Sequence, residues 1–570
     1  MIMNRVFNFL ELNDSESRMV DIIADEIRRD YVDFLVKLGK GYEKDIDWWM
    51  LNFVSRNTMI SPLFRNICYL VMLKRKLAEG QTFNEVIVDT YALSDVIYDY
   101  CSKNKYSFKI VYRGKNKMKI MFKRVYSYII VLMHILLRFI YAWRTRKYKK
   151  KIRIDKALTL LDVFVFNNSF NEGSYKDRYY PGLLDYIDSN EKEYIYYITT
   201  FYGVKNYGKV FLDLRGSKQN FLIKEDYWRF KDYVFALLYP FKVRKFNFKF
   251  SEFMGFDITS LLREEISNDK VSNSSIYGLL NYSFAKRLKE SEVKIKTVVN
   301  WFENQTIDHG FNGGFRKYYP EVNLIGYLGI PLQDNYLSIF PTEQERICEV
   351  IPKDIFVIGK GYIDPIKKFC KNLSVKVAPA FRLSGVWNKR KYYPDKNKYS
   401  ILVALPILMD ESDEIISTIL KVADLIKIKN CVFKIKPHPS HNIKKISSRW
   451  NKKFTEVFEF VGGDFNSCVE KADILISCAS SVCLETLSKG IPVIIVASKI
   501  GLTQLSIPGD IEQDTWRLCY TAKEISDAVI FYLSIDKETI KKYKVIGDKI
   551  KKDYFEPITM RKVKEFIGLK

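Results

Sequence analysis

Short runs of Val, Ile, Leu and aromatic residues recur along this chain, with helix-length stretches between them. Strands that alternate with helices predict parallel, doubly wound sheets, because a parallel pair of strands needs a long crossover connection. The pattern therefore predicts an α/β protein with two Rossmann-like halves that face one another across a cleft. The expected strands are 158–166, 194–200, 296–302 and 323–327 in the first half, and 354–358, 399–405, 431–435, 472–476 and 492–496 in the second.

The spacing of these runs divides the chain into four parts. A helical N-terminal region is expected over residues 1–80, and a first Rossmann-like domain over 81–340. A second Rossmann-like domain is expected over 345–540, followed over 541–570 by a lysine-rich C-terminal helix that crosses back. Ligands of such sheets bind beyond the carboxyl ends of the strands, so polar residues at strand ends are the candidates for function.

The net charge of +25 is concentrated in one insert of the first domain. Residues 102–153 contain 17 Lys or Arg and no Asp or Glu, and they enclose the most apolar run of the chain, Val125–Trp143. Ser127, His134, Arg138 and Tyr141 recur at helical spacing and form a narrow polar stripe. An apolar helix with basic flanks predicts a segment that lies in the interface of an anionic membrane. A core helix, a membrane span and a nucleic-acid surface are the alternatives, and no nucleic-acid-binding signature accompanies the charge.

The cysteines and acidic residues give no sign of a metal site. The nine Cys contain no C-x-x-C pair, which argues against a zinc module or a disulfide framework and favours a reducing cytoplasm. Asp45 and Asp47 match D-x-D, but they lie in a Trp-rich, helical stretch. We therefore predict no bound metal and no cofactor.

The sequence KIKPHPSH follows directly on the expected strand 431–435. Pro437 and Pro439 fix the backbone on either side of His438 and point its imidazole away from the strand end. Lys436 and His438 are predicted to form a cationic pair at a phosphate leaving group, although a His that caps a turn is the alternative.

A second polar cluster follows the strand 472–476, in the sequence SCASSVCLETLSKGIPVII. Ser480 and Ser481 lie at the expected start of a helix, where hydroxyls and free backbone N–H groups favour an anion. Glu485 is placed to accept hydrogen bonds from ribose hydroxyls. A plain Ser N-cap is the alternative.

Together, K-P-H-P, the Ser pair with its S-S-x-x-x-E spacing and the G-x-P-V strand resemble the nucleotide-binding half of bacterial GT-B glycosyltransferases. The resemblance is to sialyl-, polysialyl- and Kdo-transferases, which use CMP-activated sugars. It implies that the second domain binds the nucleotide-sugar, that the first binds the acceptor, and that His438, Ser480 and Ser481 hold the CMP phosphate. CDP-glycerol-type phosphotransferases of wall polymer synthesis share a similar K-P-H-P.

Enzymes of the resembling type carry an acidic general base near the cleft, in a D/E-D/E-G-like motif. Glu303, at the end of the expected strand 296–302, matches by position, although this motif is absent there. Glu172, in Asn-Glu-Gly, is a second candidate, and Asp308 with His309 is a third. An acid that caps the following helix is the alternative.

Further segments resemble surface-carbohydrate biosynthesis proteins found with capsule and lipopolysaccharide genes. They follow in order along the chain as SPLF (61–64), NEVIVDT (84–90), SYKDRYYPGLLDYI (174–187), WFENQ (301–305), IGYLG (325–329) and VIGKG (357–361). Gly359 and Gly361, in the last of these, permit a close approach of the backbone to a nucleotide, or form a plain turn.

The expected function is therefore glycosyl transfer. The chain is predicted to be a metal-independent, inverting GT-B enzyme, peripheral on the cytoplasmic face of the inner membrane. It would move a sugar such as Kdo or a sialic-acid-like sugar from CMP to a lipid-linked or growing surface glycan. A glycerol- or ribitol-phosphate transferase and a non-catalytic GT-B-like membrane assembly protein are the alternatives.

Overall fold

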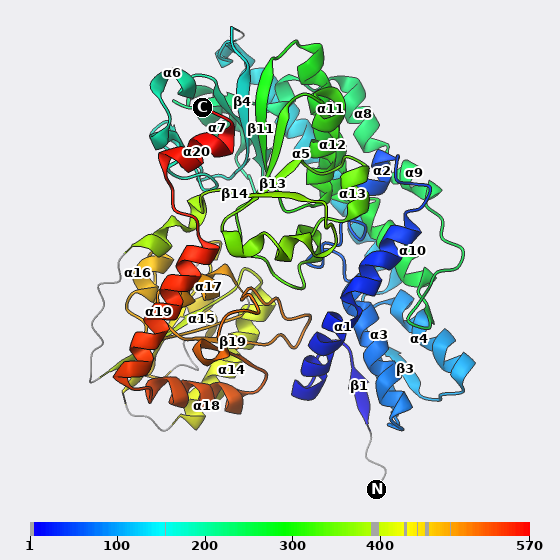
Figure 1. Ribbon diagram of the computed structural model, residues 1–570. Helices are drawn as coiled ribbons and strands as arrows, with labels where there is room; N and C mark the ends of the chain where they lie inside the picture. Colours follow the sequence, from blue (N-terminus) through cyan, green and yellow to red (C-terminus); the bar gives the residue numbers. More distant parts are fainter. Residues whose placement is uncertain are drawn as a thin grey trace.

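The computed structural model describes residues 5–153, 155–388, 398–426, 430–441, 443–450, 455–478 and 480–569. It contains two open parallel sheets and a smaller N-terminal sheet, each with helices packed against it (Figure 1). The two large sheets confirm the predicted fold class of two doubly wound α/β domains that face a cleft.

The first domain (residues 117–388) is built on a parallel sheet with the strand order β14-β13-β12-β11-β4-β7-β8. The order reverses between β4 and β11, so these strands flank the topological switch point, where doubly wound sheets bind ligands. The strands of this sheet are β4 (Leu158–Val165), β7 (Ile195–Phe201), β8 (Asn220–Leu222), β11 (Ile295–Trp301), β12 (Asn323–Leu328), β13 (Asp354–Val357) and β14 (Ser374–Val377).

Helices and two short hairpins accompany this sheet. Of these, the helix 259–269 and the hairpin 252–257 pack against helices of residues 5–112 rather than on the sheet. The helices are α5 (Lys117–Arg144), α6 (Ser189–Lys192), α7 (Tyr207–Gly216), α8 (Phe230–Leu237), α9 (Tyr239–Lys242), α10 (Thr259–Asp269), α11 (Asn273–Glu290), α12 (Thr306–Tyr318) and α13 (Glu343–Ile347). The hairpins are β5 (Phe170–Asn171) with β6 (Ser174–Tyr175), and β9 (Glu252–Phe253) with β10 (Phe256–Asp257).

The second domain (residues 398–536) has the parallel strand order β17-β16-β15-β18-β19-β20, with its switch point between β15 and β18. Its central strands are buried on both faces, as their near-continuous Val/Ile/Leu runs require. The elements are β15 (Tyr399–Ala404), α14 (Met409–Leu425), β16 (Cys431–Lys436), α15 (Ile443–Trp450), β17 (Phe458–Phe460), α16 (Phe465–Val469), β18 (Ile474–Ser477), α17 (Ser481–Leu487), β19 (Val493–Val496), β20 (Trp516–Cys519) and α18 (Ala522–Leu533).

The boundary between the domains differs from the predicted one. The strand 354–358, which we assigned to the second half, is β13 and pairs with β12 in the first sheet. The first sheet ends with β14, so the chain crosses to the second domain after residue 377 rather than near residue 345. A strand pattern predicts a strand, but it does not indicate which of two sheets the strand joins.

The N-terminal unit (residues 5–112) is also not purely helical. β1 pairs in parallel with β2, and β2 with β3. The segment NEVIVDT (84–90), which we placed in the first domain (81–340), therefore contributes a strand to this small sheet instead. The elements are β1 (Val6–Asn8), α1 (Asp14–Leu38), α2 (Ile46–Trp49), α3 (Leu63–Ala78), β2 (Glu85–Val88), α4 (Tyr91–Asn104) and β3 (Lys109–Tyr112).

The C-terminal helices cross back to the first domain, as predicted. α19 (Lys537–Tyr554) packs on α17 of the second domain, and α20 (Met560–Ile567) lies against the first domain (Figure 1). Phe566 of α20 packs on the rings of Tyr327, Phe356 and Phe381. The two domains are therefore tied together by a linker and by this returning segment.

Gly359 and Gly361 pack against the C-terminal segment, where we had expected a nucleotide. A Cβ atom on Gly359 would overlap the backbone of Tyr554, and one on Gly361 would overlap its ring. The close approach that we expected is therefore between the backbone after β13 and the end of α19.

Gly359→Ala should destabilise the packing of the C-terminal segment on the first domain. The new Cβ would overlap the backbone of Tyr554, which cannot move aside as the end of a flexible side chain can. We expect a loss of about 1–3 kcal/mol, the range typical of overpacking. The measurement is the shift in thermal unfolding midpoint relative to wild type. Gly462→Ala, where a Cβ meets nothing within 4 Å, is the matched control and should leave the midpoint unchanged. Equal midpoints for the two variants would contradict this packing role.

Candidate active site in the interdomain cleft

A cavity of about 370 Å³ lies between the domains at the switch point of the second sheet. Residues that follow β15, β16, β18 and β19 form its second-domain wall, and residues that follow β12 form its first-domain wall. His438 and Ser480 line the former wall, and Gln333 and Tyr336 line the latter. The cavity therefore lies where a doubly wound sheet binds its ligand.

His438 offers this cavity a neutral imidazole. Its Nδ1 accepts a hydrogen bond from the backbone N–H of Ser440 at 3.2 Å, which assigns the ring proton to Nε2. Burial, together with the neighbouring His441 and Arg382, lowers the pKa of His438 to about 4. At neutral pH the ring is therefore an N–H donor rather than the cation that we expected.

Lys436 does not share the phosphate-facing position that we predicted for it. It is the last residue of β16, it is buried, and its Nζ donates to the carbonyl oxygen of Gly463 at 2.6 Å. The side chain thereby fixes the loop after β17.

Arg382 provides the positive charge that Lys436 was expected to supply. It follows the last strand of the first sheet, at the start of the crossing to the second domain, and its guanidinium lies 5.9 Å from the ring centre of Trp301. Its charge also lowers the pKa values of His438 and Glu485, both in the second domain. Arg382 therefore lies between the two domains, close to the candidate phosphate-binding residues.

The two serines of the pair face different surroundings. Ser480 is the N-cap of α17, has extended backbone, lines the cavity and makes no capping hydrogen bond with its side chain. Ser481 is instead hydrogen-bonded to Glu485, one turn further along the helix. Burial raises the pKa of Glu485 to about 7, against the lowering effects of Arg382 and of this hydrogen bond. Ser480 is thus the serine that the cavity exposes to a ligand.

Glu303 lies just behind the opposite wall, at the end of β11. Its Oε1 accepts a hydrogen bond from the indole N–H of Trp301 at 2.9 Å. Its Oε2 accepts from the Gln305 amide at 2.9 Å and from the Tyr336 hydroxyl at 3.0 Å. The carboxylate is not itself among the cavity-lining residues, so Tyr336 connects it to the cavity.

Tyr336 is a functional residue that the sequence pattern did not single out. Its oxygen accepts a hydrogen bond from Gln305 at 2.8 Å while its hydroxyl donates to Glu303. Burial and the carboxylate of Glu303 raise the pKa of Tyr336 well above its ordinary value. Tyr336 also lines the cavity, so it is the member of this hydrogen-bonded group that a ligand can approach.

Asp308 and His309, which we considered as acid/base candidates, are buried away from the cavity. Asp308 accepts hydrogen bonds from the backbone N–H groups of Glu303 and Gln305, which shapes the turn that carries Glu303, and burial raises its pKa to about 8. His309 is fully buried, and its two ring nitrogens lie 3.0 Å from Trp49 O and from Glu345 Oε1. Neither side chain reaches a substrate in this arrangement.

Glu172, the remaining candidate, is exposed at the tip of the β5–β6 hairpin. Its φ of 46° and that of 74° at Gly173 form the tight turn, and Lys218 N–H donates to Gly173 O there. The hairpin packs on Phe221 of the edge strand β8. The sequence Asn-Glu-Gly therefore forms a hairpin turn. Glu172 takes no part in the hydrogen bonds around Glu303.

The N-terminal unit closes one side of the cleft. Asp21 of α1 accepts hydrogen bonds from Thr503 N–H at 2.9 Å and from the Tyr520 hydroxyl at 3.0 Å, and Ser17 donates to the carbonyl oxygen of Ser498. Ser498 and Thr503 line the cavity. The helix α1 therefore holds a wall of the site in position.

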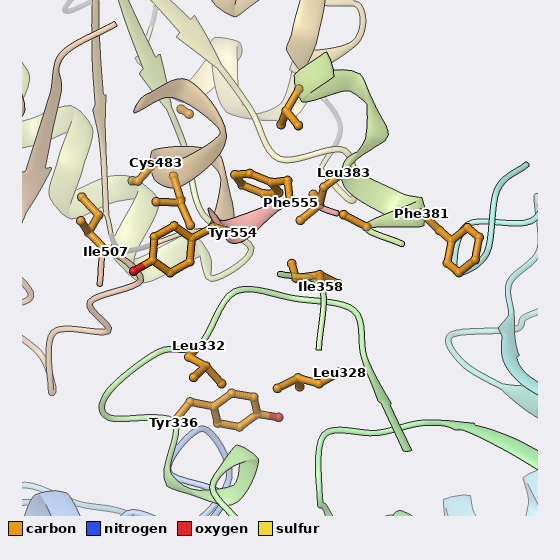
Figure 2. Packing of buried hydrophobic residues seen from close by; sticks show 14 of the residues in the cluster. Leu328, Leu332, Tyr336, Ile358, Phe381, Leu383, Cys483, Ile507, Tyr554 and Phe555 are labelled. Carbon is orange, nitrogen blue, oxygen red and sulfur yellow. The ribbon is translucent and has the colours of Figure 1, made fainter. Parts of the chain in front are cut away.

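A second cavity, of about 520 Å³, lies beside the first. The segment around Leu332–Gln333 and that around Gln504–Leu505 separate the two, joined by the hydrogen bond from Asp334 N–H to Leu505 O at 3.1 Å. Leu332 lines the second cavity from the first domain, and Ile507 and Tyr554 line it from the other side (Figure 2).

Within the described part of the chain, no group of three or more His, Cys, Asp or Glu is placed to hold a metal ion.

Comparisons with known proteins leave the family open. No family model and no curated protein match the sequence. Similar solved structures include the S. aureus MnaA–UDP co-structure (TM-score 0.44, 11% identity, 72% of this chain and 98% of that one). They also include the lipopolysaccharide outer core galactosyltransferase WaaB in its apo form (TM-score 0.39, 12% identity, 72% of this chain and 99% of that one). A third is Acinetobacter baumannii MurG (TM-score 0.40, 9% identity, 72% of this chain and 99% of that one). TM-scores below 0.5 add nothing to what the sheets themselves establish.

Proposed function

We propose that this protein is a glycosyltransferase that transfers a sugar from a nucleotide donor, with a CMP-sugar favoured, to a hydroxyl of a lipid-linked or growing surface glycan. One observation carries the proposal. His438 and Ser480 line the same cavity as Tyr336, whose hydroxyl is bonded to Glu303. This arrangement supports the proposal, because candidate donors to a phosphate would lie across the cavity from a candidate base.

On the donor side, the phosphate would accept hydrogen bonds from His438 Nε2–H and from the Ser480 hydroxyl. Arg382 would supply the positive charge beside them. As the bond between the anomeric carbon and the phosphate oxygen breaks, the electron pair stays on the phosphate. Preorganised hydrogen-bond donors would stabilise that developing charge.

On the acceptor side, the attacking hydroxyl would donate its proton to the oxygen of Tyr336. Tyr336 would pass its own proton to Glu303 Oε2, and the acceptor oxygen would bond to the anomeric carbon. The products are the glycoside, the nucleotide and a protonated Glu303, which returns its proton to solvent.

The preference for CMP comes from the resemblance of the K-P-H-P and Ser-Ser segments, and the cavity is consistent with several nucleotides. A glycerol- or ribitol-phosphate transferase would use the same phosphate-binding groups, but its acceptor would attack phosphorus instead of carbon. Mass spectrometry of the product separates the reactions, because glycosyl transfer adds a sugar without phosphorus.

The donor site is tested by thermal shift of the wild-type protein with CMP, CDP, UDP and GDP. A ligand that binds only the folded state raises the unfolding midpoint. At a free ligand concentration of about 100 times Kd, the folded state is stabilised by roughly 2.7 kcal/mol. We expect one of these nucleotides, CMP first among them, to raise the midpoint, and His438→Ala, Ser480→Ala and Arg382→Ala to weaken its binding at least tenfold.

The control for this experiment is Ser534→Ala, which removes an exposed hydroxyl at the end of α18. It should bind the nucleotide as wild type does. Undiminished binding by all three cleft variants would contradict the donor site, and the absence of any nucleotide binding would favour a non-catalytic protein.

A further inference from the structure

The helix α5 presents a continuous apolar stripe to solvent. Met118, Phe122, Val125, Ile129, Leu136 and Trp143 follow one another at intervals of three, four or seven residues, so they share one side of the helix. Each of these side chains is between 53% and 67% exposed. We call this set the α5 outer face. Such a face is the reverse of an ordinary surface helix, which turns its apolar side toward the core.

The polar side of α5 faces the protein. Arg138 is 4% exposed, its Nε donates to Glu225 at 2.8 Å, and its guanidinium packs over the rings of Phe201 and Tyr277. At Arg138, the polar stripe predicted for this helix therefore packs against the protein. An ion pair buried in this way fixes the helix against the domain, since separating the pair would leave a buried charge without its partner.

The helix is also held along its length. Tyr128 donates a hydrogen bond to Leu237 O of α8 at 2.8 Å, and Phe139 packs edge-on against Tyr233. α5 is the one described helix that is long and apolar enough to cross a membrane, with a mean hydropathy of 1.8. Its packed inner side makes it a surface element of the first domain instead.

The neighbouring helices extend the apolar surface. α8 exposes Phe230 (84%), and the segment that leads into and through α9 exposes Leu238 and Phe241. Large exposed apolar patches on soluble proteins typically mark a surface that binds a partner or a membrane.

Positive charge surrounds the α5 outer face. Lys117, Lys119 and Lys123 are exposed in its first turns, and Arg144 and Lys147 are exposed at its end. Residues 102–153 contain no acidic side chain that would oppose them. Each basic residue near an anionic bilayer contributes about 1 kcal/mol of attraction, while the apolar side chains enter the acyl boundary.

We propose that the α5 outer face, with α8 and α9, docks on the surface of an anionic phospholipid bilayer, with the axis of α5 in the membrane plane. The charge favours this occupant over a second copy of the chain, because two such faces would bring like charges together. The proposal goes beyond the proposed function and stands without it, since docking requires no donor. It would place the cleft of a membrane-associated enzyme beside lipid-linked acceptors.

The test is co-sedimentation of the full-length protein with phosphatidylcholine vesicles, with and without 30% phosphatidylglycerol. Wild type should bind the anionic vesicles, and less so at high salt. Phe122→Ser/Ile129→Ser/Leu136→Ser should reduce the partition coefficient at least tenfold. The matched control is Ile22→Ser/Ile347→Ser/Val545→Ser, which removes three equally exposed apolar side chains elsewhere and should bind as wild type does.

A charge variant, Lys117→Glu/Lys119→Glu/Lys123→Glu, leaves the apolar side chains in place and should lose binding to anionic vesicles specifically. Circular dichroism should show all variants folded, because every altered side chain is exposed. Undiminished binding by both α5 variants would overturn the proposal. So would a wild-type dimer in light scattering that the triple Ser variant abolishes, or resistance of membrane-bound protein to alkaline carbonate, which indicates a span.

Discussion

Glu303→Gln should lower kcat by about 10²- to 10⁴-fold, the contribution typical of a general base. The amide is nearly isosteric and can keep a hydrogen bond with Trp301 or Tyr336, but it cannot take up a proton. The expected signature is a fall in kcat with little change in the apparent affinity for the donor nucleotide, because Glu303 lies behind the first-domain wall. Steady-state kinetics with the donor identified by thermal shift would measure both quantities.

Tyr336→Phe tests how Glu303 reaches the acceptor. If the proton passes through the phenol, this variant should lose nearly as much activity as Glu303→Gln, since Glu303 then has no hydroxyl through which to reach the cavity. Tyr202→Phe removes an exposed hydroxyl and Glu321→Gln an exposed carboxylate, and both should retain full activity. A Tyr336→Phe enzyme with normal kcat would contradict the relay, and a Glu303→Gln enzyme with normal kcat would exclude Glu303 as the base.

Arg56→Met should cause the largest loss of stability among single substitutions at the interface between the N-terminal unit and the first domain. Arg56 Nη2 lies 2.9 Å from the carboxylate of Glu345, and both residues are almost fully buried. Removal of one partner leaves a buried charge uncompensated, which costs about 3–5 kcal/mol. We expect the thermal midpoint to fall by roughly 5 °C or more.

Arg18→Met is the matched control, because its ion pair with Glu524 is largely exposed and such pairs contribute about 0–1 kcal/mol. Burial alone would raise the pKa of Glu345, but Arg56 and His309 lower it to about 2. A carboxyl group whose pKa is lowered on folding stabilises above its ordinary pKa of 4.5 and loses that effect as the pH falls toward 2. The midpoint difference between wild type and Arg56→Met should therefore be constant at neutral pH and shrink below about pH 4.5. A difference that grows on acidification would contradict the assignment.

The second domain was predictable from the sequence to a useful degree. Its central strands are buried on both faces, so they appear as mainly apolar runs, and the predicted 399–405 and 431–435 match β15 and β16 closely. The edge strands β17 and β20 are partly exposed and were not predicted. His438 and Ser480 could be found because each follows such a run directly, and the ends of neighbouring parallel strands meet at one edge.

Other parts of the site could not be predicted, for physical reasons. Tyr336 and Arg382 lie at short 3-10 turns in segments that connect longer elements, where nothing in the local pattern indicates what they approach. The ion pair of Arg56 and Glu345 joins residues 289 positions apart, so His309, which completes it, resembled a catalytic residue in the sequence. Likewise, the apolar run of α5 was visible, but only the packing shows which of its sides faces the protein.

The central claim is tested most directly by a crystal structure of the protein soaked with the nucleotide that stabilises it. The account predicts that the phosphate attached to the ribose lies within hydrogen-bonding distance of His438 Nε2 and Ser480 Oγ, with the guanidinium of Arg382 beside it. Nucleotide bound instead in the larger cavity next to Tyr554, or anywhere outside the cleft, would contradict it.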